Sequence, residues 1–180
     1  MQNNNDKLPL CVDLDGTLVL GDVTWQAVYQ LLKRNLFNGI FLLFWLLKGR
    51  AYLKSQLARY VYLSPRALSY RQNLLNYLKS QVGVRPMYLV TAADGHFAKA
   101  IAEYLGVFNG VEASNGVINL RQKAKRDHLI QKFGREKFIY IGNSFDDLYV
   151  WEASAEAWVC SSNARLLIKV SKLGKPERFF

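Results

Sequence analysis

The sequence predicts an α/β fold, namely a three-layer Rossmann-like parallel sheet with an inserted small helical cap. Four short apolar runs alternate with segments of helical periodicity, an order typical of parallel strands joined by right-handed crossovers. A long helical stretch lies between the first two of these runs and predicts the cap. The 180 residues can bury the core of one domain that carries an insertion.

The first predicted strand covers Leu8 to Leu14 and is apolar except for Pro9 and Asp13. Asp13 is therefore near the carboxyl end of this strand, where open α/β sheets bind their ligands. Asp15 follows, and Gly16 lets the chain turn away without a side chain in the crevice. Because the burial of a carboxylate is costly, a divalent cation is the expected neighbour.

The predicted cap spans residues 18–86, where apolar residues recur at helical spacing. This spacing predicts four helices, and Pro65 marks the start of the last one. The predicted helices are Trp25 to Leu36, Asn38 to Lys48, Tyr52 to Val61 and Arg66 to Val82.

The segment Ile40 to Leu47, with the sequence IFLLFWLL, is too short to cross a bilayer, which takes about 20 residues. It is apolar on every side, which is more than one helix face in a small cap can bury. Three interpretations stay open: cap-helix core, a groove for the apolar tail of a substrate, and docking to a membrane surface or a membrane protein. A basic cluster that suits anionic headgroups or phosphate follows it, formed by Lys48, Arg50, Lys54 and Arg59.

The remaining strands and helices alternate along the chain. Strands are predicted at Met87 to Thr91, Phe138 to Ile141 and Ala157 to Cys160, and helices at Gly95 to Leu105 and Lys125 to Phe133. Within residues 111–120, the pair Asn115-Gly116 predicts a hairpin turn. The predicted core thus comprises residues 7–17 and 87–163, and residues 164–180 are predicted as a basic C-terminal helix or tail.

The net charge of +10 is compatible with an anionic membrane surface, an anionic substrate or solubility alone. Nucleic acid is not expected as a partner, because the basic residues are dispersed and form no known nucleic-acid motif. Cys11 and Cys160 lie in apolar runs, which indicates reduced, buried thiols. Together with the lack of a visible signal peptide, this predicts a cytoplasmic protein, with the inner face of a membrane as a further location.

Polar residues follow the carboxyl ends of the predicted strands or open the next helix. They are Asp13 with Asp15, Thr91, a lysine of the pair Lys123 and Lys125, and Asn143 with Asp146 and Asp147. Because the carboxyl ends of parallel strands meet at one crevice, these groups are expected to converge. Carboxylates, a hydroxyl and an ammonium group at one place predict a phosphate site.

This set of side chains suits the hydrolysis of a phosphomonoester. A carboxylate can attack phosphorus in line and form an aspartyl-phosphate, which divides one difficult displacement into two easier ones. Mg²⁺ prefers oxygen ligands and offsets the repulsion between the two anions. A second acid can protonate the leaving oxygen and later activate water, while a hydroxyl and a lysine hold the remaining phosphate oxygens.

The order of these motifs resembles the haloacid dehalogenase (HAD) superfamily of phosphohydrolases: DLDGT, a threonine after a second strand, a lysine before a helix, and a glycine-led acidic loop. The resemblance covers residues 8–163 and implies that Asp13 is the nucleophile and Asp15 the general acid/base. It implies phosphate binding by Gly16, Thr91, Ala92 and Lys125, the last being favoured by KRDHL over the alternative Lys123. It implies Mg²⁺ binding by Asp13, Asp15, Asn143 and Asp147.

Two narrower resemblances concern the cap and the substrate. The insertion directly after the first motif is similar to the C1-type cap of phosphoserine-phosphatase-like members. The stretches PLCVDLDGTL, WLLKGRAYLK and YIGNSFDDLYVW are similar to the soluble N-terminal domain of some UbiA-family membrane prenyltransferases. This likeness implies a lipid-linked or small phosphorylated substrate. It also implies that residues 164–180 correspond to the place where the membrane domain begins in fused relatives.

One position departs from the family pattern. The usual acidic loop is GDxxxD, whereas Gly142 is followed here by Asn143. An amide oxygen can still bind Mg²⁺, and Asp147 occupies the second acidic position with Asp146 beside it as a further candidate. The loss of one charge predicts weaker metal binding. It also keeps a second hypothesis open, a catalytically weak or inactive HAD-like module associated with a membrane prenyltransferase or a lipid phosphate.

Overall fold

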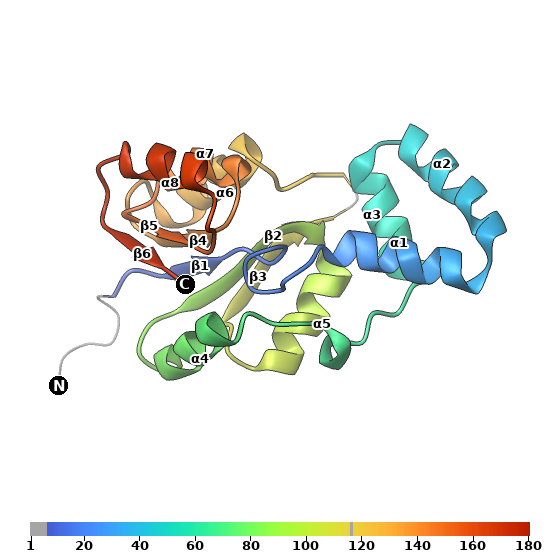
Figure 1. Ribbon diagram of the computed structural model, residues 1–180, viewed down its shortest axis with the longest axis horizontal. Helices are drawn as coiled ribbons and strands as arrows, with labels where there is room; N and C mark the ends of the chain where they lie inside the picture. Colours follow the sequence, from blue (N-terminus) through green and yellow to red (C-terminus); the bar gives the residue numbers. More distant parts are fainter. Residues whose placement is uncertain (1–6, 116) are drawn as a thin grey trace.

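The computed structural model describes residues 7–115 and 117–180 and contains a six-stranded sheet (Figure 1). The strand order is β3-β2-β1-β4-β5-β6, and every neighbouring pair is parallel. The strands are β1 (Leu10–Val12), β2 (Met87–Asp94), β3 (Gly110–Ser114), β4 (Ile139–Gly142), β5 (Glu156–Val159) and β6 (Glu177–Phe179). The predicted three-layer, Rossmann-like α/β fold is confirmed.

Helices cover both faces of the sheet (Figure 1). One face carries α4 (Gln72–Gln81) and α5 (Gly95–Leu105), and the other carries α6 (Lys123–Phe133), α7 (Leu148–Trp151) and α8 (Ala164–Ser171). Each face has its own apolar cluster because successive strand residues point to opposite sides. Leu10 and Val12 of β1 share a cluster with Leu78 of α4, whereas Cys11 shares one with Leu129 of α6.

The cap stands at the carboxyl end of the strands and consists of α1 (Val23–Arg34), α2 (Gly39–Leu47) and α3 (Arg50–Tyr60) (Figure 1). Asp22 caps α1 by accepting a hydrogen bond from the backbone N–H of Trp25 at 3.0 Å. Short 3-10 helices lie in three connections, at η1 (Leu36–Asn38), η2 (Pro65–Ala67) and η3 (Phe145–Asp147).

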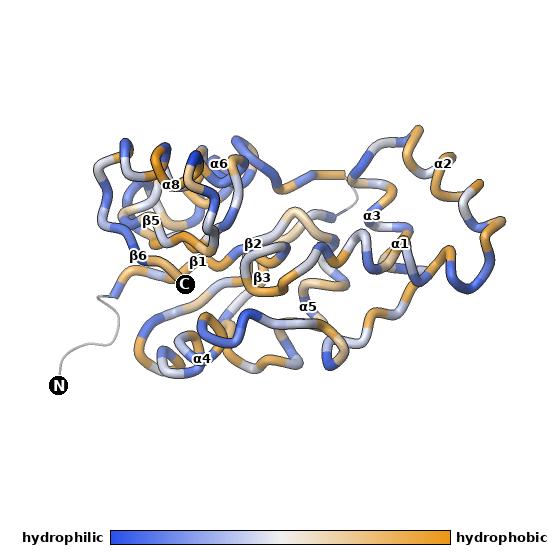
Figure 2. Tube along the Cα trace, in the orientation of Figure 1, coloured by the Kyte–Doolittle hydropathy of each residue, from blue (hydrophilic) through white to orange (hydrophobic). Residues whose placement is uncertain are grey.

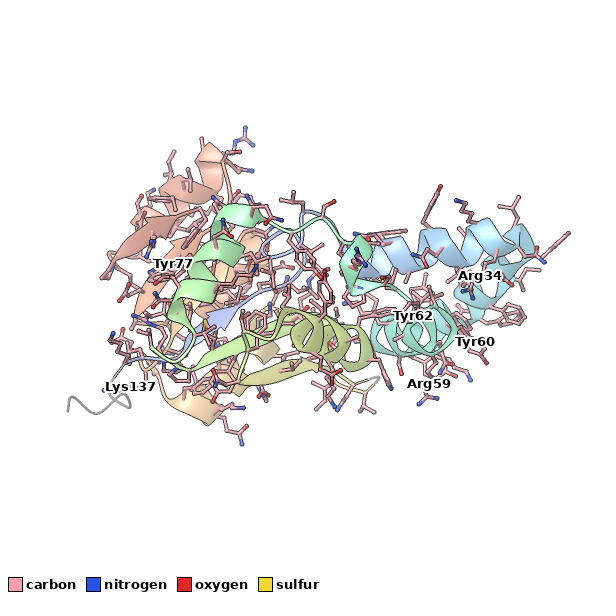
Figure 3. All side chains as sticks on the ribbon, turned by 90° about the horizontal axis from the view of Figure 1, so that it is seen from below. Arg34, Arg59, Tyr60, Tyr62, Tyr77 and Lys137 are labelled. Atoms are coloured by element: carbon pink, nitrogen blue, oxygen red, sulfur yellow. The ribbon has the colours of Figure 1, made fainter. Side chains whose placement is uncertain are left out.

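The cap is smaller than the predicted span of residues 18–86, because α4 belongs to the core. The Tyr77 ring of α4 packs against the rings of Trp158 and Phe180, with centroids 5.5 and 5.4 Å away. Figure 3 shows Tyr77 at the opposite end of the molecule from the cap residues Arg34 and Tyr60. Amphipathic periodicity predicts the helix correctly but cannot tell which apolar surface it covers.

The C-terminal segment, residues 164–180, contains a helix as predicted and also a strand of the sheet. After α8, residues 177–179 form β6, which pairs in parallel with β5 through Trp158 and Arg178. The Arg178 guanidinium lies 4.1 Å from the centroid of the Tyr77 ring. A charged three-residue edge strand has no apolar pattern, so the sequence does not predict it.

The hairpin predicted at Asn115-Gly116 is wrong. β3 pairs in parallel with β2, and no strand follows it within the described residues 117–122. Asn115 instead accepts hydrogen bonds from the backbone N–H groups of Val117 and Ile118, and Gly116 itself lies outside the described residues. The local turn signal is real, but the neighbouring strand β2 supplies the pairing partner.

Candidate active site

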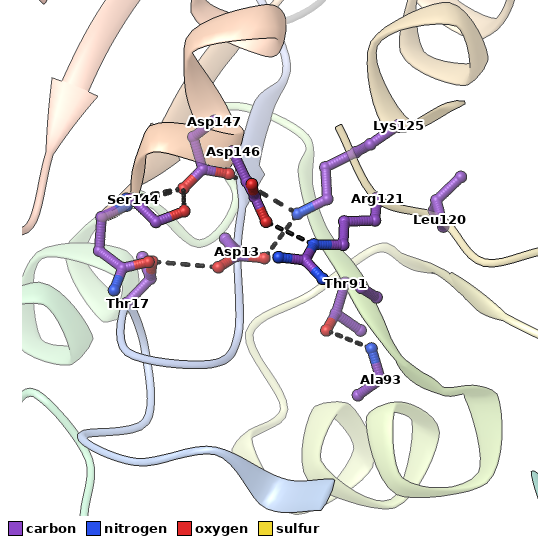
Figure 4. Close-up of polar contacts among 12 residues, drawn as sticks. Asp13, Thr17, Thr91, Ala93, Leu120, Arg121, Lys125, Ser144, Asp146 and Asp147 are labelled. Atoms are coloured by element: carbon purple, nitrogen blue, oxygen red, sulfur yellow. Dashed lines mark hydrogen bonds and ion pairs between the residues drawn. The ribbon is translucent and has the colours of Figure 1, made fainter. Parts of the chain in front are cut away.

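Asp13 lies just past the carboxyl end of β1, where its backbone N–H still donates to the carbonyl of Ile141 in β4 at 2.9 Å. The residue is 7% exposed, and its Oδ1 accepts a hydrogen bond from Nζ of Lys125 at 2.7 Å (Figure 4). Burial raises the pKa of Asp13 to about 6, and the Lys125 ammonium opposes this rise. A buried, ion-paired carboxylate therefore stands where the sequence predicts the attacking group.

Asp15 lies where the loop after β1 meets the start of the cap. Its Oδ1 accepts a hydrogen bond from the backbone N–H of Val23, the first residue of α1, at 2.8 Å. Burial raises the pKa of Asp15 to about 7, and the carboxylate of Asp22 adds to the rise. Such a carboxyl group populates both protonation states near neutral pH, as a group that gives and later takes a proton requires.

Lys125 is the lysine that reaches the site. It is buried on α6, and its Nζ also donates to the Tyr140 hydroxyl at 2.9 Å and lies 3.8 Å from Oδ1 of Asp147. Burial by itself lowers the pKa of Lys125, but the carboxylates of Asp13 and Asp147 outweigh it and raise the pKa. Lys123 is exposed and lies over the ring of Tyr149, so the geometry favours Lys125.

Thr91 and Ala92 lie on β2, which runs three residues beyond the predicted end of this strand to Asp94. The buried Thr91 hydroxyl oxygen accepts a hydrogen bond from the backbone N–H of Ala93 at 2.9 Å, an arrangement that leaves its O–H to donate elsewhere. Ala92 lines the pocket beside Asp13, and its carbonyl accepts from Nζ of Lys54 at 2.6 Å. Ala92 is thus at the predicted crevice, and Thr91 lies fully buried directly before it on β2.

Asp147, a predicted metal ligand, lines the pocket and holds the acidic loop in place. Its Oδ2 accepts hydrogen bonds from the N–H groups of Asn143 and Ser144 and from the Ser144 hydroxyl, each at 3.0 Å. Its Oδ1 accepts from the Tyr140 hydroxyl at 2.7 Å. Through these hydrogen bonds Asp147 orients the acidic loop, and it faces Lys125 at 3.8 Å. A Cβ on Gly142 would come within 2.7 Å of this carboxylate.

Asn143 presents its side-chain oxygen to the same hydroxyl as Asp13. Oδ1 of Asn143 and Oδ2 of Asp13 lie 3.2 and 3.3 Å from the hydroxyl oxygen of the buried Thr17. Asp15 lines the same pocket. The side chains of Asp13, Asp15 and Asn143 can therefore offer oxygen atoms as metal ligands, and Mg²⁺ prefers oxygen ligands. Among the described residues no three His, Cys, Asp or Glu side chains are grouped to hold a metal.

Asp146 holds an arginine at the rim of the pocket. Its carboxylate forms an ion pair with Arg121 (Figure 4). It also accepts a hydrogen bond from Nε2 of Gln122 at 2.6 Å. These partners lower the pKa of Asp146 despite a partial burial that acts to raise it. Asp146 is therefore occupied by a cation already, and it serves less well as a metal ligand than Asn143 does.

Arg71, just before α4, is a positioning residue that the sequence does not reveal. Its guanidinium donates to the carbonyls of Thr17 and Gly16 at 3.0 and 3.1 Å, and to that of Cys160 at 3.4 Å. It ties the DLDGT loop to the end of β5. No motif marks such a residue, since it acts through backbone carbonyls distant in the sequence.

The pocket in front of Asp13 has a volume of about 370 Å³ and lies between core and cap. Besides the predicted residues it is lined by Trp25, Lys54 and Arg121. Burial lowers the pKa of Lys54, although the carboxylates of Asp15 and Asp22 favour its charged form. The sequence places Lys54 in a basic cluster, but only the packing of α3 shows that it reaches the site.

An apolar groove of about 350 Å³ adjoins this pocket within the cap. It lies between α1, α2 and α3, and its lining includes Val28, Leu42 and Leu53. Trp25 lines both the groove and the pocket that contains Asp13. The cap therefore offers an apolar surface next to the polar site.

No family model matches the chain. The chain is 36% identical over 180 residues to the uncharacterized protein y4nM of Sinorhizobium fredii (strain NBRC 101917 / NGR234), a match that covers 96% of this chain and 33% of that protein. The chain thus spans about a third of the length of this curated relative.

Three solved structures are similar to the chain. A protein of unknown function from Bordetella pertussis Tohama I is 16% identical over 97% of this chain and 98% of its own, with a TM-score of 0.68. A haloacid dehalogenase-like family hydrolase from Streptococcus pneumoniae is 15% identical, covers 96% and 93%, and has a TM-score of 0.60. A phospho-aspartyl intermediate analogue of phosphoserine phosphatase is 13% identical, covers 96% and 93%, and has a TM-score of 0.56. These similarities show that the chain has the HAD fold.

Proposed function

We propose that this chain is a Mg²⁺-dependent phosphomonoester hydrolase that acts through an aspartyl-phosphate on Asp13. One observation carries the proposal: a buried carboxylate, ion-paired to a buried lysine, opens onto a pocket two residues before a carboxyl group whose pKa is about 7. The similarity to phosphoserine phosphatase, a structure of which represents a phospho-aspartyl intermediate, supports this choice of chemistry.

In the first step a carboxylate oxygen of Asp13 attacks phosphorus while the bond from phosphorus to the ester oxygen breaks. Protonated Asp15 gives its proton to the departing oxygen, so the product leaves as an alcohol. In the second step Asp15 takes a proton from a water molecule, which attacks the same phosphorus. The bond between phosphorus and Asp13 breaks, inorganic phosphate leaves, and both carboxyl groups return to their starting states.

The other residues of the site hold the phosphate and the nucleophile. Lys125 fixes Asp13 by its 2.7 Å hydrogen bond and supplies positive charge to the phosphate oxygens. The Thr91 hydroxyl donates to a further oxygen. Mg²⁺, held by oxygens of Asp13, Asp15 and Asn143, would supply the charge that lets two anions approach.

The apolar groove beside the polar pocket supports a substrate with an apolar portion, such as a lipid-linked phosphate, over a small polar metabolite. Trp25 joins the polar pocket to the apolar groove, so a phosphate at Asp13 and a hydrocarbon chain beside Leu42 can be bound together. Lys54 and Arg121 add positive charge at the polar end.

The test is release of inorganic phosphate from an aryl phosphate, a polyprenyl monophosphate and a panel of small metabolite phosphates. We expect turnover that needs Mg²⁺ and is abolished in Asp13→Asn, while Asp127→Asn, an exposed acid on α6, keeps it. We also expect the polyprenyl phosphate to have the highest kcat/KM. Full activity in Asp13→Asn would contradict the mechanism, and a preference for a small metabolite would contradict the substrate class.

A second candidate function is a non-catalytic module that binds a lipid phosphate or a membrane prenyltransferase, and Asn143 favours it. Replacing this amide by a carboxylate restores the charge at the metal site. Under our proposal Asn143→Asp tightens Mg²⁺ binding and changes the rate only several-fold. A rise from no detectable turnover to clear activity would instead favour the non-catalytic module.

A further inference from the structure

Helix α2 turns most of its apolar side chains to the outside of the molecule. Only Leu42 and Trp45 pack partly against the core, and no residue of the helix is fully buried. The exposed fractions of its other large side chains are 57% for Ile40, 54% for Phe41, 61% for Leu43, 60% for Phe44, 48% for Leu46 and 77% for Leu47. An apolar surface of this extent is uncommon on a monomer and marks an interaction site.

Positive charge surrounds this apolar helix. Every charged residue from Val23 to Ala93 is a lysine or an arginine. Exposed basic side chains stand at both ends of α2: Lys33 and Arg34 before it, and Lys48 and Arg50 after it. Figure 2 shows the hydrophobic trace of α2 between two hydrophilic turns.

Aromatic side chains complete the edge of this surface. Tyr60 and Tyr62 are 62% and 74% exposed, and Figure 3 shows them beside Arg34 and Arg59 at the cap end of the molecule. Trp45 stacks on Tyr60 with ring centroids 5.4 Å apart. Tyrosine and tryptophan next to arginine and lysine are typical of segments that lie in the headgroup region of a bilayer.

We propose that the cap docks on the surface of an anionic lipid bilayer, with the exposed side of α2 inserted among the lipids and the flanking basic residues on their headgroups. Charge complementarity favours this occupant over a second copy of the chain, which would bring like charges together. Among residues 7–115 and 117–180 no helix is long and apolar enough to cross a membrane. The docking does not rest on the proposed hydrolase activity.

Docking in this manner also places the apolar groove against the lipid. Leu43 and Leu46 belong both to the exposed side of α2 and to the lining of the groove. A hydrocarbon chain could then pass between the bilayer and the groove without crossing water.

The experiment is co-sedimentation of the full chain with vesicles of phosphatidylcholine alone or mixed with phosphatidylglycerol. We expect binding at least about tenfold tighter to the vesicles that contain phosphatidylglycerol, because each basic residue near the surface adds attraction. This binding should weaken in high salt. Lys48→Gln/Arg50→Gln should remove most of the difference between the two kinds of vesicle.

A matched pair of double variants separates α2 from surface hydrophobicity in general. Ile40→Ser/Phe44→Ser removes side chains that are 57% and 60% exposed, and it should abolish vesicle binding. Ile168→Ser/Phe179→Ser removes side chains that are 57% and 56% exposed on the core, and it should leave binding unchanged. Circular dichroism and phosphate release from a soluble aryl phosphate show whether each variant is folded.

Several outcomes would overturn the docking proposal. They are a lack of binding to either kind of vesicle, equal binding to both kinds, and an equal loss in the two double variants. Sedimentation velocity provides a further check: a dimer that Ile40→Ser/Phe44→Ser converts to monomer would assign this surface to a second copy of the chain.

Discussion

At the scale of residues, two carboxyl groups one position apart have different surroundings. Asp13 points to Lys125 and Thr17, whereas Asp15 points to the backbone N–H of Val23 in the cap. Burial raises both pKa values, and only Asp13 has a buried cation in hydrogen-bond contact. This difference supports the proposed roles, nucleophilic attack by Asp13 and proton transfer by Asp15, because the role of a carboxyl group follows from its environment.

The raised pKa values predict a pH-dependent stability. Both carboxyl groups titrate near 3.8 when unfolded but at about 6 and about 7 when folded, so the folded protein binds more protons between these values. The free energy of unfolding should therefore fall as the pH rises through this window, by about 1.4 kcal/mol for each unit by which a pKa is raised. In metal-free buffer, we expect the Tm of the wild type to fall more steeply with pH than that of Asp13→Asn/Asp15→Asn.

Thermal unfolding followed by circular dichroism across this window measures the two slopes. Other titrating groups are common to both proteins and cancel in the comparison. Parallel curves for the wild type and the double variant would show that neither carboxyl group has a raised pKa. Added Mg²⁺ should flatten the wild-type curve, since a bound cation favours the ionised carboxylates.

The surroundings of Gly16 predict that adding a single methyl group, as in Gly16→Ala, lowers both stability and turnover. Its φ is +73°, and a Cβ there would lie 2.2 Å from Nδ2 of Asn143. We expect Gly16→Ala to lower the free energy of unfolding by about 2 kcal/mol and to reduce Mg²⁺-dependent turnover at least about tenfold, because it displaces the proposed metal ligand Asn143. Gly106→Ala is the control: its φ is +63°, but nothing lies within 4 Å of the added Cβ.

Chemical denaturation and phosphate release measure the two effects. Gly106→Ala should lose about 1 kcal/mol of stability through its backbone strain and keep its activity. Equal losses of activity in the two variants would mean that the contact with Asn143 does not matter.

At the scale of elements, α4 links the structural core to the catalytic loop. Its apolar side packs on the sheet through Leu74 and Leu78, and the preceding Arg71 holds the carbonyls of Gly16 and Thr17. The helix therefore transmits the rigidity of the sheet to the loop that carries Asp15. The cap helices α1 and α3 instead bring Trp25 and Lys54 over the pocket.

Arg71→Met tests this role of α4. The variant keeps most of the side-chain volume but leaves three carbonyls without their charged donor, so we expect about 2 kcal/mol less stability. Turnover should fall at least about tenfold with little change in KM, because the loop positions the reacting groups and not the substrate chain. Arg66→Met, an exposed arginine in η2, serves as the control.

Steady-state kinetics and denaturation of Arg71→Met, Arg71→Lys and Arg66→Met complete this test. The lysine of Arg71→Lys cannot reproduce the several N–H donors of the guanidinium group, so this variant should recover only part of the stability and turnover lost in Arg71→Met. A change confined to KM would place Arg71 in substrate binding instead of loop positioning.

At the scale of the whole molecule, the pocket exists only where the cap meets the core. Asp13, Lys125 and Asn143 come from the core, whereas Trp25 and Lys54 come from the cap. The hydrogen bond from Lys54 to the carbonyl of Ala92 joins the two parts at 2.6 Å. The reacting groups and the groups proposed to select the substrate are thus on different parts of the fold.

Lys54→Met should separate selection from chemistry. We expect KM for a phosphorylated substrate to rise about tenfold and kcat to change less, because the cap lysine binds the substrate without touching the reacting bond. Lys79→Met, an exposed lysine on α4, should change neither value. A loss of kcat with an unchanged KM would show that Lys54 acts in the chemical step.

Much of this fold and site is predictable from the sequence, because both rest on local patterns. Four apolar runs give β1, β2, β4 and β5, and helix α5 has the predicted bounds, Gly95–Leu105. Asp13 and Asp15 follow β1, Thr91 lies on β2, and Lys125 lies in the first turn of α6 with its Nζ at Asp13. Their functional roles remain proposals, and so does the link to UbiA-family prenyltransferases.

The sequence by itself determined the alternation of strands and helices and the polar groups at the strand ends, since periods of 2 and 3.6 residues are set by local geometry. Only the tertiary structure decided which surface each element covers. It placed α4 on the sheet, added β6 to the edge of the sheet, brought Lys125 instead of Lys123 to Asp13, and showed that Asp147 holds its own loop through hydrogen bonds. These outcomes depend on contacts between residues far apart in the chain, whose free energies no local pattern records.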